Sequence, residues 1–301
     1  MRQVTVSVPA TSANLGPGFD CLGLALDLRQ DVTFIPQSQP GLNISAAGED
    51  AKKIPLDASN LVYQAAEIIF RRLGNRPIGL TIHQNNCIPI GSGLGSSSSA
   101  VLAGMFGANA LTGDHLSPPE ILQLATNLEG HPDNVAPAVY GGLVLGVQGP
   151  DGLVVDRIQV PQMRVAIILP NYILLTVDAR AALPSDVPLK DAIFNVSRLG
   201  LLIRALQSAD YDKLSVAMQD RLHQPYRVPL IPGMKEAFGA AREAGASGVA
   251  ISGAGPSLLA FAPTQHQEIV GAAVASFQRA GLVCRSWILP VDIKGVQIRY
   301  N

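Results

Sequence analysis

The chain carries few charged residues and no cluster of like charges. Of its 301 residues, 15% are charged and 48% are hydrophobic, and the net charge is −1. This composition excludes an intrinsically disordered chain and predicts one large or two ordinary globular domains. Because there is no basic block to neutralise phosphates along a nucleic acid, we expect no nucleic-acid partner.

Long apolar runs and a paired set of cysteines are also missing. No uninterrupted apolar run reaches the roughly 18 residues that a membrane span requires, so we expect no membrane association. The opening segment MRQVTVSVPA alternates like a strand and lacks the apolar core of a secretion signal. Cys21, Cys87 and Cys284 are odd in number and far apart, which is typical of a reduced, cytoplasmic protein.

The most distinctive segment that is present is rich in glycine and serine. Residues 89–100 read P-I-G-S-G-L-G-S-S-S-S-A, with alternating glycines followed by four serines. Glycines allow backbone N–H groups to close around an anion, and serines at a helix start lie where negative charge is favoured. The segment matches neither the Walker A loop nor the dinucleotide fingerprint. We interpret it as a phosphate-binding loop, with a flexible linker as the alternative.

Three further polar clusters interrupt the apolar pattern. The first contains Asn14 and Asp20 in a loop rich in glycine and proline, and the second is Glu129-Gly-His131-Pro-Asp133-Asn134. Two carboxylates, an imidazole and an amide in so short a segment suit a Mg²⁺-assisted phosphoryl transfer. The third cluster is G-A-G-P-S at residues 253–257, where a backbone can approach a ligand closely. Turn formation and helix capping are the structural alternatives.

Two arginines stand beside turns in this weakly charged chain. Arg180 lies in T-V-D-A-R-A-A-L-P, and Arg227 lies in H-Q-P-Y-R. Arginine beside a turn suits bidentate binding of a carboxylate. Surface ion pairs are the alternative interpretation for each.

Periodicity predicts a mixed α+β chain in two closely packed halves without internal repeats. Residues 4–8 alternate as a strand, Ser59 is the predicted N-cap of a helix, and Ser117-Pro-Pro-Glu120 is a capping-box helix start. Beyond residue 170 the pattern predicts a strand at 173–177, helices at 193–206, 212–222 and 233–244, strands at 248–252 and 258–262, a helix at 265–280, and strands at 283–289 and 296–298.

Taken together, these motifs resemble those of the GHMP kinase superfamily over nearly the whole chain. P-A-T-S-A-N-L-G-P-G-F-D, the glycine–serine loop and I-S-G-A-G-P-S resemble the three motifs of that superfamily, in order. H-P-D-N-V-A-P-A, T-V-D-A-R-A-A-L-P and Q-P-Y-R are narrower and are similar to the homoserine kinase branch.

The resemblance implies a two-domain α+β fold. Residues 1–165 would form an N-terminal ATP-binding domain with a left-handed βαβ unit, and residues 166–301 would form a ferredoxin-like C-terminal domain. Sequence patterns alone would favour the right-handed crossover. A homodimer is implied as well.

The resemblance also implies ATP and L-homoserine as substrates and Mg²⁺ as cofactor, in threonine biosynthesis. Ser97 and Glu129 would hold Mg²⁺, with Ser98 as an alternative to Ser97. The implied nucleotide-binding residues are Asn60, Leu61, Pro89, Ile90, Gly91, Ser92, Gly93, Leu94, Gly95, Ser96, Ser97, Ser98, Ser99, Gly253 and Gly255. The implied homoserine-binding residues are Asn14, Asp20, His131, Asn134, Thr176, Arg180 and Arg227.

The expected reaction is attack of the homoserine hydroxyl on the γ-phosphate, with the hydroxyl oriented by Asn134 and His131. Asp133 is either a base or a positioning group, and phosphoryl transfer tolerates the absence of a base. Two alternatives remain: another small-molecule kinase for mevalonate or sugars, and a non-catalytic nucleotide or ligand sensor. Arg180, Arg227 and Asp20 favour a zwitterionic amino acid over a sugar.

Overall fold

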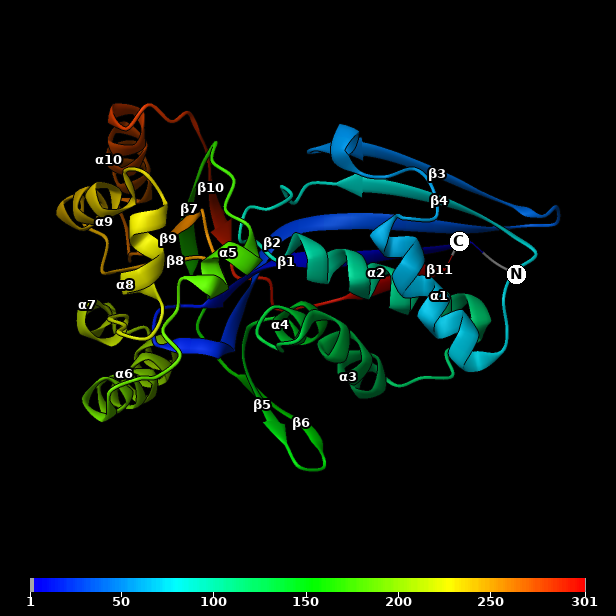
Figure 1. Ribbon diagram of the computed structural model, residues 1–301, viewed down its shortest axis with the longest axis horizontal. Coiled ribbons are helices and arrows are strands. Elements are labelled where there is room, and N and C mark those ends of the chain that lie inside the picture. The colour runs from blue at the N-terminus through cyan, green and yellow to red at the C-terminus, as the bar shows by residue number, and fades with distance from the viewer. Residues whose placement is uncertain (1–2, 301) are drawn as a thin grey trace.

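Two long antiparallel strands run through the middle of the molecule. In the computed structural model, which describes residues 3–300, β1 (Val4–Asn14) pairs with β2 (Gly18–Gln37) along almost its whole length (Figure 1). Every residue of β1 is buried, since the strand has helices on one side and the second half of the chain at its end. The predicted strand at residues 4–8 is therefore confirmed as part of a longer one.

The first sheet is built around this pair, in the order β11-β1-β2-β4-β3; β5 pairs with β2, and β6 pairs with β5. Helices pack on one face of it, and their apolar residues form one core with the inward side chains of the strands. The remaining strands are β3 (Gly41–Gly48), β4 (Gly79–Asn86), β5 (Leu143–Gly149), β6 (Gly152–Ile158) and β11 (Gln297–Tyr300). The helices are α1 (Leu61–Leu73), α2 (Ser96–Thr112), α3 (Pro118–Glu129) and α4 (Val135–Tyr140).

The second sheet has four antiparallel strands in the order β10-β7-β9-β8. When the four strands are numbered along the chain, their order across the sheet is fourth, first, third, second. This is the ferredoxin-like arrangement that was predicted. The strands are β7 (Arg164–Pro170), β8 (Gly248–Ile251), β9 (Leu258–Phe261) and β10 (Cys284–Pro290). The helices are α5 (Thr176–Ala181), α6 (Leu189–Ser208), α7 (Leu214–Ala217), α8 (Gln224–Arg227), α9 (Met234–Glu243) and α10 (His266–Arg279).

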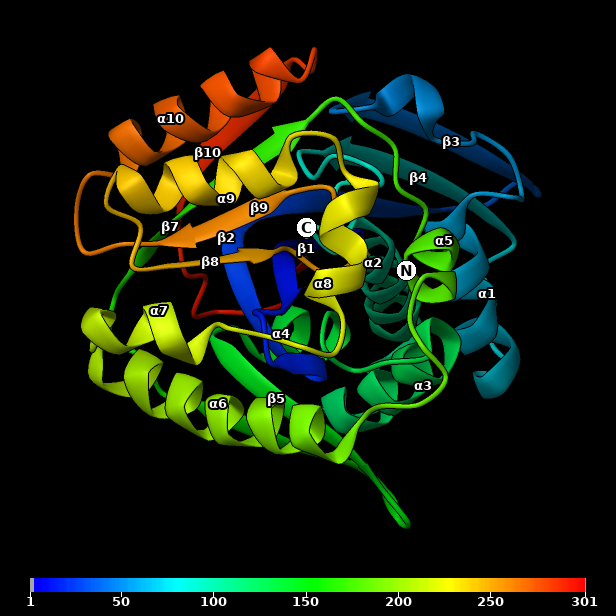
Figure 2. The same cartoon turned by 60° about the vertical axis from the view of Figure 1, so that its left-hand side comes forward.

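A shared core joins the two halves. Alternate residues of β7 point to opposite faces, so Val165 and Ile167 enter the core shared with β2, whereas Ala166 and Ile168 pack under α9 and α10. The shared core also contains Leu22 and other residues of the first sheet. The prediction of two tightly packed halves is confirmed, and Figure 2 shows α5 and α8 over the junction near α2.

Several predicted elements were wrong or incomplete. Residues 173–177 do not form a strand, because β7 is already paired on both sides and offers no free edge to this β-branched segment. The chain instead enters α5 at Thr176. The N-cap of α1 is Asn60 rather than Ser59, since the Asn60 side chain accepts a hydrogen bond from the Tyr63 amide. The predicted helix at 212–222 is much shorter, with a 3-10 turn at Tyr211–Lys213 followed by α7.

Two features of the topology were not predicted from the sequence. β3 was not predicted, and it forms the parallel pair with β4 through the connection that contains α1. β11 returns from the end of the chain to pair with β1, so the first sheet includes residues from beyond the expected boundary at 165. That division, the handedness of the β3–α1–β4 unit and the dimer remain predictions. None of the helices within residues 3–300 has the length and apolarity needed to cross a membrane.

Close packing of α1 against α2 gives a first test. A Cβ added at Gly104 would lie 2.2 Å from the Val62 carbonyl oxygen, whereas one added at Gly200 in α6 would meet nothing within 4 Å. We expect Gly104→Ala to lower the free energy of unfolding by about 1–3 kcal/mol through overpacking. Gly200→Ala should raise it by about 0.5–1 kcal/mol, because alanine favours the helix. Urea unfolding of both variants measures the two changes in the free energy of unfolding. Equal changes in the two variants would contradict the close contact between α1 and α2.

Candidate functional site

The largest concentration of predicted site residues lines a cavity of about 330 Å³ at the junction of the two halves. This junction cavity receives side chains from the end of β1, the start of β2, the segment before α4, and helices α5 and α8. Its lining includes Asn14, Asp20, Glu129, His131, Asp133, Asn134, Thr176, Arg180, Arg227, Gly253 and Gly255. All the residues predicted to hold the acceptor are thus brought together from distant parts of the sequence.

A second cavity of about 270 Å³ lies beside the first and is mostly apolar. This side cavity contains the predicted residues Asn60, Leu61 and Ile90. It also contains residues that the sequence reading missed, namely Gln30, Lys53, Ile54, Pro55, Val62, Gln84, Asn86 and Ala100. The two cavities share Gly91, Ser96 and Ser97, so the glycine–serine loop borders both.

The loop passes into α2 as the sequence predicted. Gly95 is the N-cap in a left-handed conformation, and the Ser99 amide donates to its carbonyl over 2.9 Å. The amides of residues 96–98, in the first turn, precede that first helical bond and border the cavities, where an anion is favoured. A Cβ added at Gly91 would meet nothing within 4 Å, so this side of the loop is open to a ligand.

Not every residue of the predicted phosphate loop faces a cavity. The Leu94 side chain is buried in the shared core, and its carbonyl accepts a hydrogen bond from the Thr11 amide. Ser99 is buried and donates to Gln30 over 3.3 Å. Pro89 is buried as well, and its carbonyl accepts a hydrogen bond from the Ser92 hydroxyl. These three residues support the shape of the loop.

Glu129 lies at the end of α3, opposite the start of α2. The Ser97 hydroxyl donates to its Oε1 over 2.8 Å, and the Ser98 hydroxyl donates to its Oε2 over 2.7 Å. Both serines therefore reach the same carboxylate, and the choice between them as a metal ligand stays open. The described part of the chain holds no group of three or more histidine, cysteine or acidic residues that could bind a metal. A cation here would take most of its ligands from phosphate and water.

The polar cluster before α4 is ordered by internal contacts. His131 Nδ1 lies 2.6 Å from Asp133 Oδ1, and this hydrogen bond raises the pKa of the imidazole against the opposing effect of burial. Asn134 Oδ1 accepts a hydrogen bond from the Thr11 hydroxyl over 2.8 Å. That contact fixes the amide orientation and directs its NH₂ group away from Thr11. The predicted alternative, in which Asp133 and Asn134 only cap a helix, does not account for these contacts.

Asp20 and Arg180 pair with each other across the junction cavity. The two guanidinium nitrogens donate to the two carboxylate oxygens over 2.9 and 2.8 Å. This bidentate contact raises the pKa of Arg180. Both side chains remain more than one third exposed, so a ligand can reach them.

Arg227 is a buried cation with a different set of partners. It is 2% exposed, and it donates to the carbonyl oxygens of Ala179 and Gly253 over 3.2 and 3.3 Å. Among residues 3–300, no carboxylate lies within the 4 Å of an ion pair with it, and burial lowers its pKa. Its guanidinium also lies 5.1 Å from the centre of the Phe19 ring. A buried cation with neutral partners favours an anionic ligand in the cavity.

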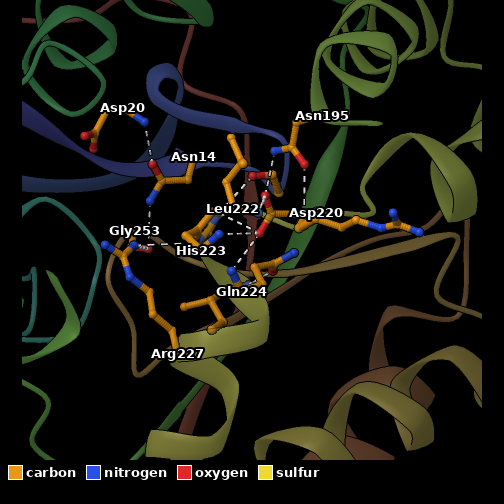
Figure 3. A network of polar contacts seen from close by, with 12 residues as sticks. Asn14, Asp20, Asn195, Asp220, Leu222, His223, Gln224, Arg227 and Gly253 are labelled. Atoms are coloured by element: carbon orange, nitrogen blue, oxygen red, sulfur yellow. Dashed lines mark hydrogen bonds and ion pairs between the residues drawn. The ribbon is translucent and has the colours of Figure 1, made fainter. Parts of the chain in front are cut away.

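Asn14 proves to be a structural bridge between the two halves. Its Nδ2 donates to the Gly253 carbonyl over 2.8 Å, and its Oδ1 accepts from the Asp20 amide over 3.0 Å (Figure 3). Next to Arg227 the same figure shows a buried network of Asp220, His223 and Gln224, to which the sequence analysis assigned no role. The only signal was the short run D-R-L-H-Q-P-Y-R, in which Asp220, His223 and Gln224 precede Arg227.

Family comparisons agree with this architecture. The GHMP kinases N terminal domain matches residues 60–142, and the GHMP kinases C terminal family matches residues 202–280. The first match contains the phosphate loop and the cluster at Glu129, and the second contains α8 with Arg227. The chain belongs to the GHMP kinase family.

Comparisons with individual proteins are more specific than the family match. The chain is 44% identical to the homoserine kinase of Moorella thermoacetica, over 93% of this chain and 94% of the relative. It also superposes on the crystal structure of homoserine kinase from Cytophaga hutchinsonii with a TM-score of 0.88 and 33% identity, covering 99% and 98% of the two chains. Mevalonate kinase of L. major gives a TM-score of 0.73 at 17% identity, covering 95% and 94%, which shows a shared fold alone.

The bridge at Asn14 yields a second prediction. Asn14→Ala leaves the Asp20 amide without its partner and the Gly253 carbonyl with only the longer contact to Arg227, and we expect a loss of about 1–3 kcal/mol in the free energy of unfolding. Asp20→Asn breaks a partly exposed ion pair and should change it by less than about 1 kcal/mol. Denaturant unfolding compares the two. A loss for Asp20→Asn as large as that for Asn14→Ala would contradict this assignment.

Proposed function

We propose that this protein is a homoserine kinase, which transfers the γ-phosphoryl group of ATP to the hydroxyl of L-homoserine in threonine biosynthesis. The observation that carries the proposal is the junction cavity. It places an acid and two arginines next to the glycine–serine loop, which also borders an apolar cavity. An acid and a cation are the opposite charges that the ammonium and the carboxylate of an amino acid require. The relatives named homoserine kinase support the choice over mevalonate or sugar acceptors.

The nucleotide would lie across both cavities. An adenine base fits the apolar side cavity next to Asn60 and Leu61, and the phosphates would lie at Gly91, Ser96 and Ser97, where the cavities meet. The first-turn amides of α2 would then hold phosphate oxygens at the positive end of the helix dipole.

Mg²⁺ fits the donor set at Glu129. One carboxylate and the hydroxyl of Ser97 or Ser98 lie at the edge of the phosphate loop, which suits a cation that keeps several water and phosphate ligands. When bound, Mg²⁺ neutralises negative charge on the phosphates. Glu129 would hold it, and the serine hydroxyls would turn from the carboxylate toward the cation.

The acceptor would be held by its two charged groups. Arg227 has only neutral partners, so it is the arginine available for the homoserine carboxylate, with Arg180 as its neighbour. Asp20 would bind the ammonium, and the Asp20–Arg180 pair would exchange part of its contact for the zwitterion. Thr176 lines the same cavity.

Positioning would then drive the reaction. The NH₂ group of Asn134 and the His131 imidazole would orient the homoserine hydroxyl toward the phosphates. The Asp133 carboxylate is already engaged by His131, which favours a positioning role over a free base. Phosphoryl transfer through a loose transition state depends mostly on alignment and charge neutralisation.

Acceptor selectivity tests the proposal directly. The purified protein with ATP and Mg²⁺ should release ADP with L-homoserine and show little turnover with mevalonate, galactose or shikimate. The reason is that only the amino acid offers both a cation for Asp20 and an anion for Arg227. Turnover with mevalonate or galactose instead would contradict the amino-acid pocket, and ATP binding without any turnover would favour a sensor.

Two variants on α3, one a control for the other, test whether Glu129 holds Mg²⁺. Glu129→Gln removes the negative charge opposite the serines, and we expect it to raise the Mg²⁺ concentration for half-maximal activity by about 10-fold or more. Glu120→Gln at the other end of the same helix keeps a capping-box residue and should behave like the wild type. A Mg²⁺ titration of ADP release measures both, and an unchanged requirement in Glu129→Gln would exclude Glu129 as the ligand.

A further inference from the structure

A buried polar network lies directly behind Arg227, on the side away from the junction cavity. It joins Asn195 of α6 to Asp220, then to His223 and Arg227, as Figure 3 shows. Asn195, His223 and Arg227 are each at most 3% exposed. So many buried polar groups in one place require a reason, because each must be fully hydrogen-bonded to avoid destabilising the fold.

Asp220 fixes the backbone that leads into α8. Its Oδ1 accepts from the Leu222 amide and from Asn195 Nδ2, over 2.9 and 2.7 Å. Its Oδ2 accepts from the amides of His223 and Gln224, over 3.0 and 2.6 Å. This short helix therefore starts from a defined geometry although it has only four residues.

The neutral imidazole ring of His223 carries a hydrogen on one nitrogen and a lone pair on the other, and its surroundings determine which nitrogen carries the hydrogen. Nε2 lies 2.8 Å from the Gly16 carbonyl oxygen, which can only accept, so Nε2 carries the hydrogen. Nδ1 is then an acceptor, and it faces Arg227 Nη1 at 3.5 Å. The ring also stacks on Phe19 with 5.0 Å between centroids and 19° between planes.

The neutral form of the imidazole is the one that the surroundings favour. Burial lowers the pKa of His223, against the opposing effect of Asp220. A protonated ring would direct a second N–H toward the guanidinium of Arg227, and two cations would face each other without solvent. In the neutral form, Nδ1 and the Gly253 carbonyl both accept from the same Arg227 nitrogen, and they fix the plane of the guanidinium.

From this arrangement we propose that His223 is a positioning residue for acceptor binding: its Nδ1 lone pair holds Arg227 in the orientation that receives the acceptor carboxylate. The inference rests on the proposed function, because it names the carboxylate of an amino acid as the ligand of Arg227. In this role His223 neither contacts the substrate nor transfers a proton. Its effect should fall on recognition of the carboxylate and leave nucleotide binding unchanged.

Two variants separate the two nitrogens of the ring. His223→Asn places an amide oxygen near the position of Nδ1 and loses the donor to Gly16. His223→Gln places an amide near the position of Nε2 and loses the acceptor for Arg227. Both remove the ring that stacks on Phe19, so each controls for the packing loss of the other.

We expect His223→Gln to raise the KM for L-homoserine by about 10- to 100-fold, because hydrogen bonds to a charged group contribute on that scale. His223→Asn should stay closer to the wild type, and the KM for ATP should be unchanged in both. Selectivity for L-homoserine over 3-aminopropan-1-ol, which lacks the carboxylate, should fall in His223→Gln. In an Arg227→Lys background, His223→Gln should add little, since its effect passes through Arg227.

Other outcomes overturn the proposal. Equal losses of melting temperature and of activity toward both acceptors would make His223 purely structural. A larger defect in His223→Asn than in His223→Gln would place the function at the Gly16 contact. Wild-type protein that does not phosphorylate L-homoserine would instead overturn the proposed function, so the two failures are distinguishable.

The wild-type protein provides a test that does not depend on folding of the variants. Long-range ¹H–¹⁵N spectra of protein labelled in histidine report which ring nitrogen carries the hydrogen. The His223 ring, assigned through its contact with Phe19, should be neutral with the hydrogen on Nε2, and its Nδ1 signal should shift when L-homoserine binds. A hydrogen on Nδ1 would exclude the contact with Arg227.

Discussion

The close approach of the glycine–serine loop to the turn at residues 252–255 is the contact on which the site depends. The Ser252 hydroxyl donates to the Gly93 carbonyl over 2.7 Å, and the Gly253 amide donates to the Ala13 carbonyl over 3.1 Å. A Cβ at Gly93 would lie 2.2 Å from the Ser252 carbonyl oxygen, so only glycine allows this distance. Because the two halves of the chain meet here, the phosphate loop and the charged groups of the second half border one cavity.

The charges around this cavity are arranged in an order that favours a zwitterion. Asp20 and Arg180 neutralise each other at the partly exposed mouth, whereas Arg227 is buried among carbonyl groups and an imidazole. An uncompensated buried cation is unfavourable in a protein interior. Hydrogen bonds from the network at His223 hold this cation in place. A ligand carboxylate bound as we propose would act on the same guanidinium from the cavity side.

Residue chemistry and spacing predicted much of the site, and they failed where strand pairing decided the outcome. The glycine–serine loop and the helix that follows it came directly from backbone requirements at a helix N-terminus. Residues 173–177 have high β-propensity, yet they form no strand, because β7, the strand that they follow, is already paired on both sides. The roles of Asn14 and His223 could not be predicted, since their partners Gly253 and Gly16 lie more than 200 residues away along the chain.

By itself, the sequence determined the local chemistry: a glycine–serine loop at a helix start, two carboxylates with an imidazole and an amide in one short segment, and arginines beside turns. It also determined the α+β class, because hydrophobic periodicity is a property of neighbouring residues. Only the tertiary structure decided which arginine has a carboxylate partner, since Asp20 pairs with Arg180 and leaves Arg227 with neutral partners. Charge pairing and burial depend on distances between segments that are far apart along the chain, and these distances exist only once the two halves have packed together.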